Sequence, residues 1–149
     1  MTVYLASYKS THTGLSGLMN RGVRFVTRSQ YSHSEICIGN PFESEVWCIS
    51  ASGVDGGVRA KRMQLNPDKW DILPLPHVSE EDATQFLSRN EGDGYDYAGV
   101  ARFLFPWAIG PSAKRWFCSE AAAAIVGLNE PWRFSPADLH IVVSRYRPE

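Results

Sequence analysis

The stretch that decides the fold is WFCSEAAAAIV, residues 116–126. Its four consecutive alanines combine high helix propensity with a slim profile, which predicts a helix over 118–126 that packs closely against a sheet. The bulky aromatic pair before the cysteine is typical of a strand end that runs directly into this helix. Cys118 opens the helix, where the helix dipole favours a thiolate. Cys118 is therefore the candidate nucleophile, and the alternative is a small buried apolar residue.

The histidine candidate lies in a predicted strand over residues 32–39. Because side chains alternate along a strand, the two isoleucines share one face, and the opposite face carries His33, Glu35 and Cys37. An imidazole beside a thiol favours the thiolate and can act as a general base. His33 is therefore the candidate base, and the alternative is a partly exposed strand histidine. The remaining histidines, interpreted as structural or solvent-facing, are His12, His77 and His140.

The rest of the pattern predicts a single α+β domain over residues 1–149. Further strands are expected at 3–7, 45–52, 58–63, 70–75 and, closing the chain, 140–144. Further helices are expected at 13–27, 79–90 and 95–105, and a short helical turn is expected to begin at 135–138. The strands 32–39 and 45–52 are close enough in sequence to form an antiparallel hairpin.

Composition excludes several classes of function. The chain has 15 basic and 16 acidic residues, so it lacks the basic excess of a general nucleic-acid-binding protein. The most apolar stretch, 99–110, is interrupted by Arg102 and Pro106 and is too short to span a bilayer, so no stable membrane insertion is expected. Residues 1–10 lack the pattern of a secretory signal. We therefore expect a cytoplasmic protein.

The three cysteines indicate reduced thiols rather than a disulfide framework, because their number is odd. Cys37 and Cys48 fall near each other across the predicted hairpin and are interpreted as reduced side chains within the sheet. With Cys118 and His33 they lack the close Cys-x-x-Cys spacing of a zinc site, so no metal is expected.

Four short elements occur in an order that is informative. They are Tyr31-Ser32-His33-Ser34-Glu35-Ile36, Asp55-Gly56-Gly57-Val58-Arg59, Tyr95-Asp96-Tyr97 and Phe117-Cys118-Ser119-Glu120. Together, over about residues 13–139, they resemble the circularly permuted branch of the NlpC-type papain-like superfamily, and most closely its small uncharacterised phage members. In ordinary members of this family the cysteine helix precedes the histidine strand, whereas in permuted members the histidine comes first, as it does here.

This resemblance implies a permuted papain-like fold, in which an antiparallel sheet packs on a central helix that starts at Cys118. It also implies a Cys–His pair completed by a third polar residue on the next strand, and matching the strand ending places Ser50 there. A hairpin turn centred between Pro41 and Phe42 would also put His33 opposite Ser50. A hydroxyl orients an imidazole weakly, so Glu35 is a second candidate for this role. The interpretation that we favour for Glu35, however, is a solvated charge on the strand.

Two further positions have open roles. In the permuted family the Tyr-Asp-aromatic element recurs, and Tyr95 is either a supporting oxyanion donor or a packing residue. Asp55-Gly56-Gly57 predicts a tight turn, because glycine tolerates positive φ. Arg59 after this turn either binds a substrate carboxylate or, as we expect, is a surface charge.

The function that these expectations support is a cysteine hydrolase of the peptidase or amidase type, which acts through a thioester acyl-enzyme. Cys118 would attack a carbonyl, His33 would accept the thiol proton, and Ser50 would orient His33, with no cofactor. The resemblance implies an amide or ester substrate, such as a peptide, a peptidoglycan stem peptide or a lipid. A phage-encoded member would act in the host cytoplasm.

Two alternatives remain open at this point. The first is a non-catalytic binding module that kept the fold, which the serine at the third position favours. The second is a lipid acyltransferase or thioesterase, in which the apolar segment 103–109 forms a loop that touches a membrane, although ordinary core is the expectation for this segment.

Overall fold

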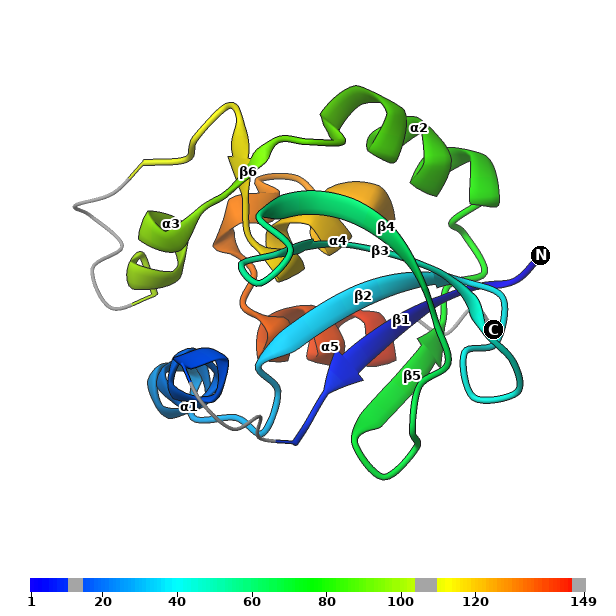
Figure 1. Cartoon of the computed structure of the whole chain (residues 1–149), viewed down its shortest axis with the longest axis horizontal. Helices are drawn as coiled ribbons and strands as arrows, with labels where there is room; N and C mark the ends of the chain where they lie inside the picture. The colour runs from blue at the N-terminus through cyan, green and yellow to red at the C-terminus, as the bar shows by residue number, and fades with distance from the viewer. Residues whose placement is uncertain (11–14, 104–109, 146–149) are drawn as a thin grey trace.

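The architecture is a curled sheet with helices packed around it, as seen in a computed structural model that describes residues 1–10, 15–103 and 110–145 (Figure 1). Within these residues, seven strands form one sheet in the order β5-β1-β2-β3-β4-β6-β7, accompanied by five α-helices and one 3₁₀ turn. The neighbouring strands are antiparallel, apart from the parallel pair β6 and β7. The expected α+β class is confirmed.

The elements match most of the expected ranges, with ends that differ by about a residue. In chain order they are β1 (Val3–Tyr8), α1 (Leu15–Thr27), β2 (His33–Ile38), β3 (Val46–Ser52), β4 (Gly57–Met63), β5 (Trp70–Pro74), α2 (Glu80–Asn90), β6 (Gly94–Tyr95), α3 (Tyr97–Ala101), β7 (Arg115–Trp116), α4 (Cys118–Val126), η1 (Pro131–Arg133) and α5 (Pro136–Arg145). The expected helix at 118–126 is confirmed and begins at Cys118.

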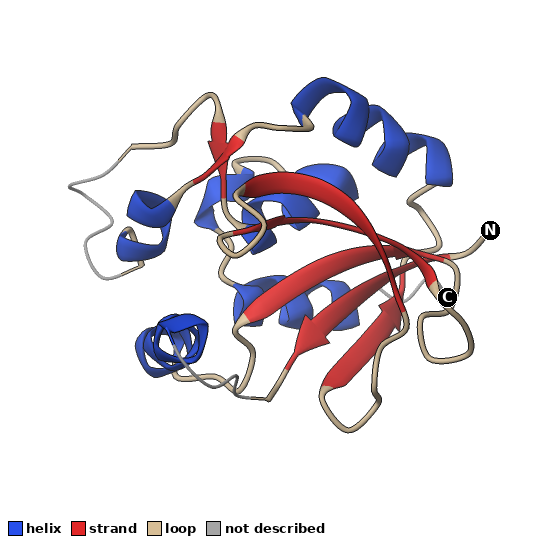
Figure 2. Cartoon of the chain, in the orientation of Figure 1, coloured by secondary structure: helices blue, strands red, loops and turns tan. Residues whose placement is uncertain are grey.

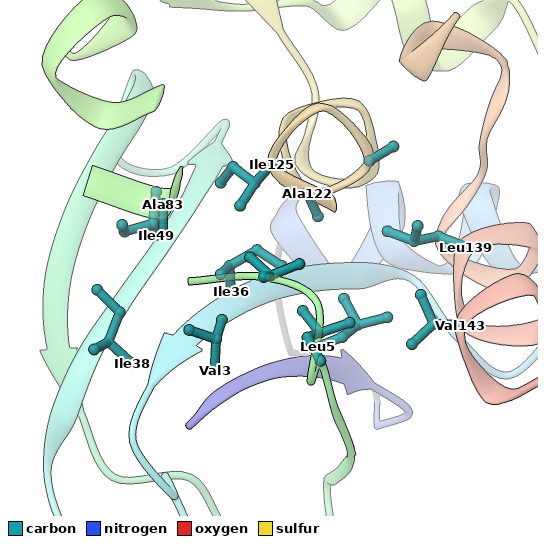
Figure 3. Close-up of a cluster of buried hydrophobic side chains, with 13 residues drawn as sticks. Val3, Leu5, Ile36, Ile38, Ile49, Ala83, Ala122, Ile125, Leu139 and Val143 are labelled. Carbon is teal, nitrogen blue, oxygen red and sulfur yellow. The ribbon is translucent and has the colours of Figure 1, made fainter. Parts of the chain in front are cut away.

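The main core lies between one face of the sheet and the helices α4 and α5 (Figure 3). Ile36 on β2 and Leu5 on β1 are completely buried there, opposite Ala122 of α4 and Leu139 of α5. Alanine side chains add little bulk, so the backbone of α4 can approach β2 and β3 closely. This close packing fixes the start of α4, and therefore Cys118, relative to β2.

The C-terminal segment is a helix, so the expected strand at 140–144 is wrong. Ser135 caps this helix, because its hydroxyl accepts a hydrogen bond from Asp138 N at 3.1 Å and the Asp138 carboxylate accepts from Ser135 N at 3.2 Å. Leu139 and Val143 are both buried, and their spacing of four residues puts them on one helix face. The β-branched run around Val143 suggested a strand, but this capping box and the apolar spacing outweigh that propensity.

The helix expected at 95–105 is also partly wrong. The observed helix α3 covers only Tyr97–Ala101, so it starts later and is shorter than expected. Tyr95 belongs to strand β6, and α3 begins only after Asp96, whose side chain accepts a hydrogen bond from Gly99 N at 3.0 Å. Residues 104–109, which include most of the apolar segment 103–109, lie outside the described residues. Among the described helices, none is long and apolar enough to cross a bilayer.

Helix α1 lies at one end of the sheet, away from the N-terminal Met1 (Figure 2). The chain leaves this helix through Arg28, which has a left-handed φ of 49°, and Ser29 N donates a hydrogen bond to Arg24 O at 3.1 Å. The chain then enters β2 at His33. The end of α1 and the candidate base are therefore close in sequence and at the same end of the sheet.

Candidate active site

Cys118 occupies the first position of α4. Phe117 before it is extended, with φ −106° and ψ 166°, and the first helical hydrogen bond runs from Ala121 N to Phe117 O at 3.0 Å. The backbone N–H groups of the first helical turn have no intrahelical acceptor, so they can stabilise negative charge near the sulfur. The Cys118 side chain is nearly buried, at 4% exposure.

His33 lies at the start of β2, opposite Tyr8 of β1. Its ring meets the edge of the Trp70 ring at a centroid distance of 6.1 Å, and its side chain is 22% exposed. Nε2 of His33 lies 2.8 Å from Oε1 of Glu35. Glu35 therefore holds the Nε2 side of the ring.

Cys118 also interacts with the His33 side chain. Burial lowers the pKa of His33, but the charge of Cys118, a hydrogen bond to Cys118 and the carboxylate of Glu35 together raise it to about 10. A histidine with this pKa carries a proton at neutral pH. The structure thus brings the two principal predicted residues together, with an imidazolium ring beside the sulfur.

Glu35 is held by Arg59 through two hydrogen bonds. Nη1 of Arg59 donates to Oε2 at 2.7 Å and Nη2 donates to Oε1 at 2.6 Å, while Nε donates to Asp55 at 2.8 Å. Burial raises the pKa of Glu35, but the hydrogen bonds from Arg59 and His33 outweigh burial and hold this pKa below its ordinary value. Glu35 is therefore ionised and fixed in position.

Two expectations are corrected by this arrangement. Glu35 is not a solvated strand charge, because its side chain is 1% exposed. Arg59 is not a simple surface charge, because its side chain is 16% exposed and divides its donors between Glu35 and Asp55. A bidentate pair of this kind has a fixed geometry, which a single lysine contact would not provide.

Ser50 does not contact His33, so its expected orienting role is not supported by the geometry. The hydroxyl of Ser50 donates to the backbone carbonyl of Ser34 at 2.6 Å. The observed pairing of Ile36 with Ile49 continues to Glu35 opposite Ser50, which moves the register two residues away from the expected His33–Ser50 pair. The physical reason is a longer turn between β2 and β3 than the one assumed from Pro41.

The small side chain of Ser50 has a different consequence. Ser50 pairs with Arg59 across β3 and β4, so it lies between Glu35 and Arg59 in one row across three strands. Neighbouring strands are about 4.8 Å apart, so a side chain on β4 reaches β2 only if the residue between them is small. Ser50 leaves the space through which the guanidinium of Arg59 reaches Glu35.

Tyr95 of β6 pairs with Trp116 of β7, two residues before Cys118. Burial raises the pKa of Tyr95 well above its ordinary value, and the charge of Cys118 raises it further. Its ring packs edge-on against Tyr97 at a centroid distance of 4.8 Å. The phenol therefore stays protonated and can donate a hydrogen bond, which is compatible with both roles that the sequence left open.

A buried acid also lies near the nucleophile. Glu120 is 3% exposed, and its carboxylate accepts a hydrogen bond from Phe117 N at 3.4 Å. Burial raises the pKa of Glu120 to about 7, although the Phe117 N–H and the charge of Arg102 act in the opposite direction. Glu120 supports the backbone turn that presents Cys118.

A second histidine network lies on the opposite face of the same strands. His140 of α5 contacts the Ser7 hydroxyl through Nδ1 at 2.9 Å and the Tyr31 hydroxyl through Nε2 at 3.2 Å. Tyr31 in turn donates to Asp71 at 2.6 Å, and Lys9 binds the other oxygen of Asp71 at 2.6 Å. Burial lowers the pKa of His140, although the charge of Asp71 opposes this change.

The other two thiols are close to each other and far from solvent. Cys37 and Cys48 are directly paired between β2 and β3, with their sulfur atoms 3.3 Å apart and both side chains completely buried. The contact with Cys48, together with burial, raises the pKa of Cys37 well above its ordinary value, so this thiol is unreactive near neutral pH. Both cysteines are free, and their proximity across the hairpin is confirmed.

The described residues therefore bring together a thiol, an imidazolium, a carboxylate and a guanidinium in that order. The role of Arg59 as the partner of Glu35 is what sequence reasoning missed. The signal for it was a charged residue that pairs with the small Ser50 on the neighbouring strand. Such a set can generate a nucleophilic thiolate and then transfer a proton. Neither a protein-family model nor a curated protein matches the sequence.

Proposed function

We propose that the chain is a cysteine hydrolase on a permuted papain-like fold, with Cys118 as nucleophile and His33 as general base and acid. Glu35 orients His33, and Arg59 holds Glu35 in place. The substrate is an amide or an ester, since a thioester acyl-enzyme can form from either.

The observation that carries this proposal is the contact of His33 with both the buried Glu35 carboxylate and the Cys118 side chain. Its Nε2 lies 2.8 Å from Glu35, and Cys118 and Glu35 together raise its pKa to about 10 against the effect of burial. A nucleophilic cysteine site needs a base beside the thiol and a third polar group that orients this base, and His33 and Glu35 are placed for these two roles.

The chemistry follows from these contacts. The Cys118 sulfur attacks the carbonyl carbon, and the proton on His33 passes to the leaving amine or alcohol as its bond to the carbonyl breaks. The resulting thioester is attacked by water, which gives one proton to His33, and the carbon–sulfur bond then breaks to release the acid and the Cys118 thiolate beside the protonated His33. Glu35 keeps the imidazole ring in one orientation through both proton transfers.

Oxyanion stabilisation has two sources near the sulfur. The free N–H groups of the first turn of α4 are the first, because they point out of the helix beside Cys118. The protonated hydroxyl of Tyr95 is the second. Donors of this kind act on charge that develops only in the transition state, so they lower the barrier rather than simply strengthen binding.

Alkylation of the native protein with iodoacetamide at neutral pH tests the Cys–His pair. We expect Cys118 to react in the wild type and to react about 30-fold more slowly in His33→Ala, because an unassisted thiol is only a few per cent ionised at pH 7. His140→Ala is the matched control and should leave the rate unchanged. Peptide mass spectrometry assigns the modified residue, and the buried Cys37 and Cys48 serve as internal unreactive references.

A second measurement separates an enzyme from a non-catalytic module. The wild type, mixed with p-nitrophenyl acetate, should release p-nitrophenol and carry an acetyl group on the Cys118 peptide, and Cys118→Ala should do neither. The near-complete burial of Cys118 is the observation that favours the module instead. An inert Cys118 in both measurements would reject the hydrolase.

A further inference from the structure

The charges of this chain are distributed unevenly along its length. The first acidic residue is Glu35, so residues 1–34 contain four basic side chains and no acidic one, although the whole chain has a net charge of −1. Three of the four are arginines of α1 and the residue after it: Arg21, Arg24 and Arg28. An excess of one sign on a single surface element indicates a partner of the opposite sign.

The outer side of α1 and the residue after it carry arginines beside an exposed aromatic ring. Arg21 and Phe25 are four residues apart, which puts them on one side of α1. Arg28 follows the last residue of this helix and has a left-handed φ of 49°. Both arginines are exposed, and the side chain of Phe25 is 83% exposed. A phenylalanine this exposed, on an otherwise charged helix face, has no covering contact within the described residues and is costly to leave in water.

Two more exposed apolar residues lie near the candidate active site. Tyr97 is 59% exposed, and its hydroxyl donates to Gly53 O at 3.2 Å, next to Val54 at 78% exposure in the turn between β3 and β4. The Tyr97 ring contacts Tyr95, which is close to Cys118. Figure 1 places α1 and α3 at the same end of the molecule, away from the N-terminal Met1.

We propose that the surface formed by Arg21 and Phe25 of α1 and by Arg28 directly after it docks on an anionic lipid bilayer. Phe25 enters the interface, the two guanidinium groups bind lipid phosphates, and the catalytic end of the molecule faces the membrane. Basic residues with aromatic ones on an exposed helix are the chemistry that binds at a bilayer surface. A purely anionic partner without an apolar region would bind the arginines but would leave Phe25 in water, whereas a bilayer offers both phosphates and an apolar interior.

The proposal is independent of the chemistry at Cys118, because it concerns only where the protein docks. Binding is therefore measured with Cys118→Ser, which cannot form an acyl-enzyme. Failure of the hydrolase assays leaves the docking measurement intact, and failure to dock leaves the alkylation measurement intact.

Co-sedimentation with vesicles tests the docking. The probe is phosphatidylcholine vesicles with about one-third phosphatidylserine, compared with pure phosphatidylcholine, at about 0.05 M salt. We expect binding only to the anionic vesicles. Arg21→Ala and Arg28→Ala should each weaken binding about five-fold, because each arginine near an anionic surface contributes a similar amount. Phe25→Ala should weaken it about ten-fold.

Matched controls lie elsewhere on the surface. Arg89→Ala removes the same charge from the exposed side of α2, and Ile141→Ala removes an apolar side chain that is 53% exposed on α5. Both should bind like the parent protein. Circular dichroism of every variant confirms that α1 and the rest of the fold are retained.

Three outcomes would overturn the proposal. The first is no sedimentation with anionic vesicles at low salt. The second is equal weakening by Arg89→Ala and Arg28→Ala, which would indicate a nonspecific charge effect. The third is full binding to a single-stranded oligonucleotide that competes with the vesicles and survives Phe25→Ala, which would identify a polyanion site rather than a bilayer site.

Discussion

The two histidine networks of this chain use similar groups but hold their histidines in opposite charge states. His33 lies in direct contact with the carboxylate of Glu35 and near Cys118, and its pKa is raised to about 10. His140 is separated from Asp71 by the hydroxyl of Tyr31, and burial lowers its pKa. The comparison shows that direct contact with a negative group decides whether a buried histidine keeps its proton.

The surroundings of the two carboxylates explain the rest of the difference. Glu35 is almost fully buried and bound bidentately by Arg59, so its charge acts at close range with little screening. Asp71 is 35% exposed and shares its charge with Lys9. One network is therefore suited to hold a proton for chemistry, and the other joins α5 to β1 and β5.

The largest expected effect is that of Glu35→Gln compared with Asp71→Asn. Glu35→Gln removes the charge next to His33 and leaves Arg59 with one carboxylate, so Cys118 alkylation should slow by about ten-fold or more and the free energy of unfolding should fall by about 3 kcal/mol. Asp71→Asn should leave alkylation unchanged and cost about 1 kcal/mol. Alkylation kinetics and urea unfolding measure both, and equal alkylation rates in the two variants would show that the networks do not differ in this way.

The next largest effect is on the pH dependence of folding stability, because the two histidines lose their stabilising contributions in opposite directions of pH. The pKa of His33 is raised, so its protonated form stabilises the fold below pH 6.5, and this stabilisation is lost as pH rises toward about 10. The pKa of His140 is lowered, so its neutral form is favoured, and the stability it contributes is lost as pH falls below 6.5.

Urea unfolding between about pH 5 and about pH 10 measures this difference. Within the His33 window the wild type should lose up to about 1.4 kcal/mol per pH unit more than His33→Gln, because one proton is released. His140→Gln should change only the acidic side of the profile. A His33→Gln profile parallel to the wild type above pH 7 would contradict the assigned protonation of His33.

The smallest expected effect is that of substitutions at Ser50. They show whether this residue only leaves room for Arg59 to reach Glu35 or whether it orients His33. Ser50→Ala removes one hydrogen bond to Ser34 O, so it should cost about 1 kcal/mol and leave Cys118 alkylation within about two-fold of the wild type. Ser50→Val should cost about 1–3 kcal/mol, because it crowds the space between Glu35 and Arg59. If Ser50→Ala slows alkylation as much as His33→Ala does, Ser50 and not Glu35 is the orienting residue.

Local signals in the sequence predicted much of the fold. The alanine run predicted α4, and the capping box at Ser79 and Asp82 agreed with the helix expected there. Where local signals competed, prediction failed. The β-branched residues of α5 suggested a strand, whereas the cap at Ser135 and burial of Leu139 and Val143 decided for a helix.

In the candidate site, too, the residues with clear local signals were predicted and those that depend on strand pairing were not. Cys118 and His33 were predicted because a cysteine at a helix start and a histidine on a strand are local features. The register between β2 and β3 decided the position of Ser50, which pairs with Glu35 and not with His33. Glu35 is two residues from His33 on the same strand face, so that contact was open to prediction, and its burial was not. Arg59 depended on two registers at once, so the sequence suggested only a surface charge.

By itself, the sequence determined the α+β class, the helix that begins at Cys118, the strand that carries His33 and the basic character of the first 34 residues. These follow from propensity, periodicity and charge, which act over a few neighbouring residues. Only the tertiary structure decided that Glu35 and Arg59 meet across Ser50 and that His33 stays protonated while His140 does not. Those outcomes depend on register, burial and distances between charges, which are set when strands far apart in the sequence pair.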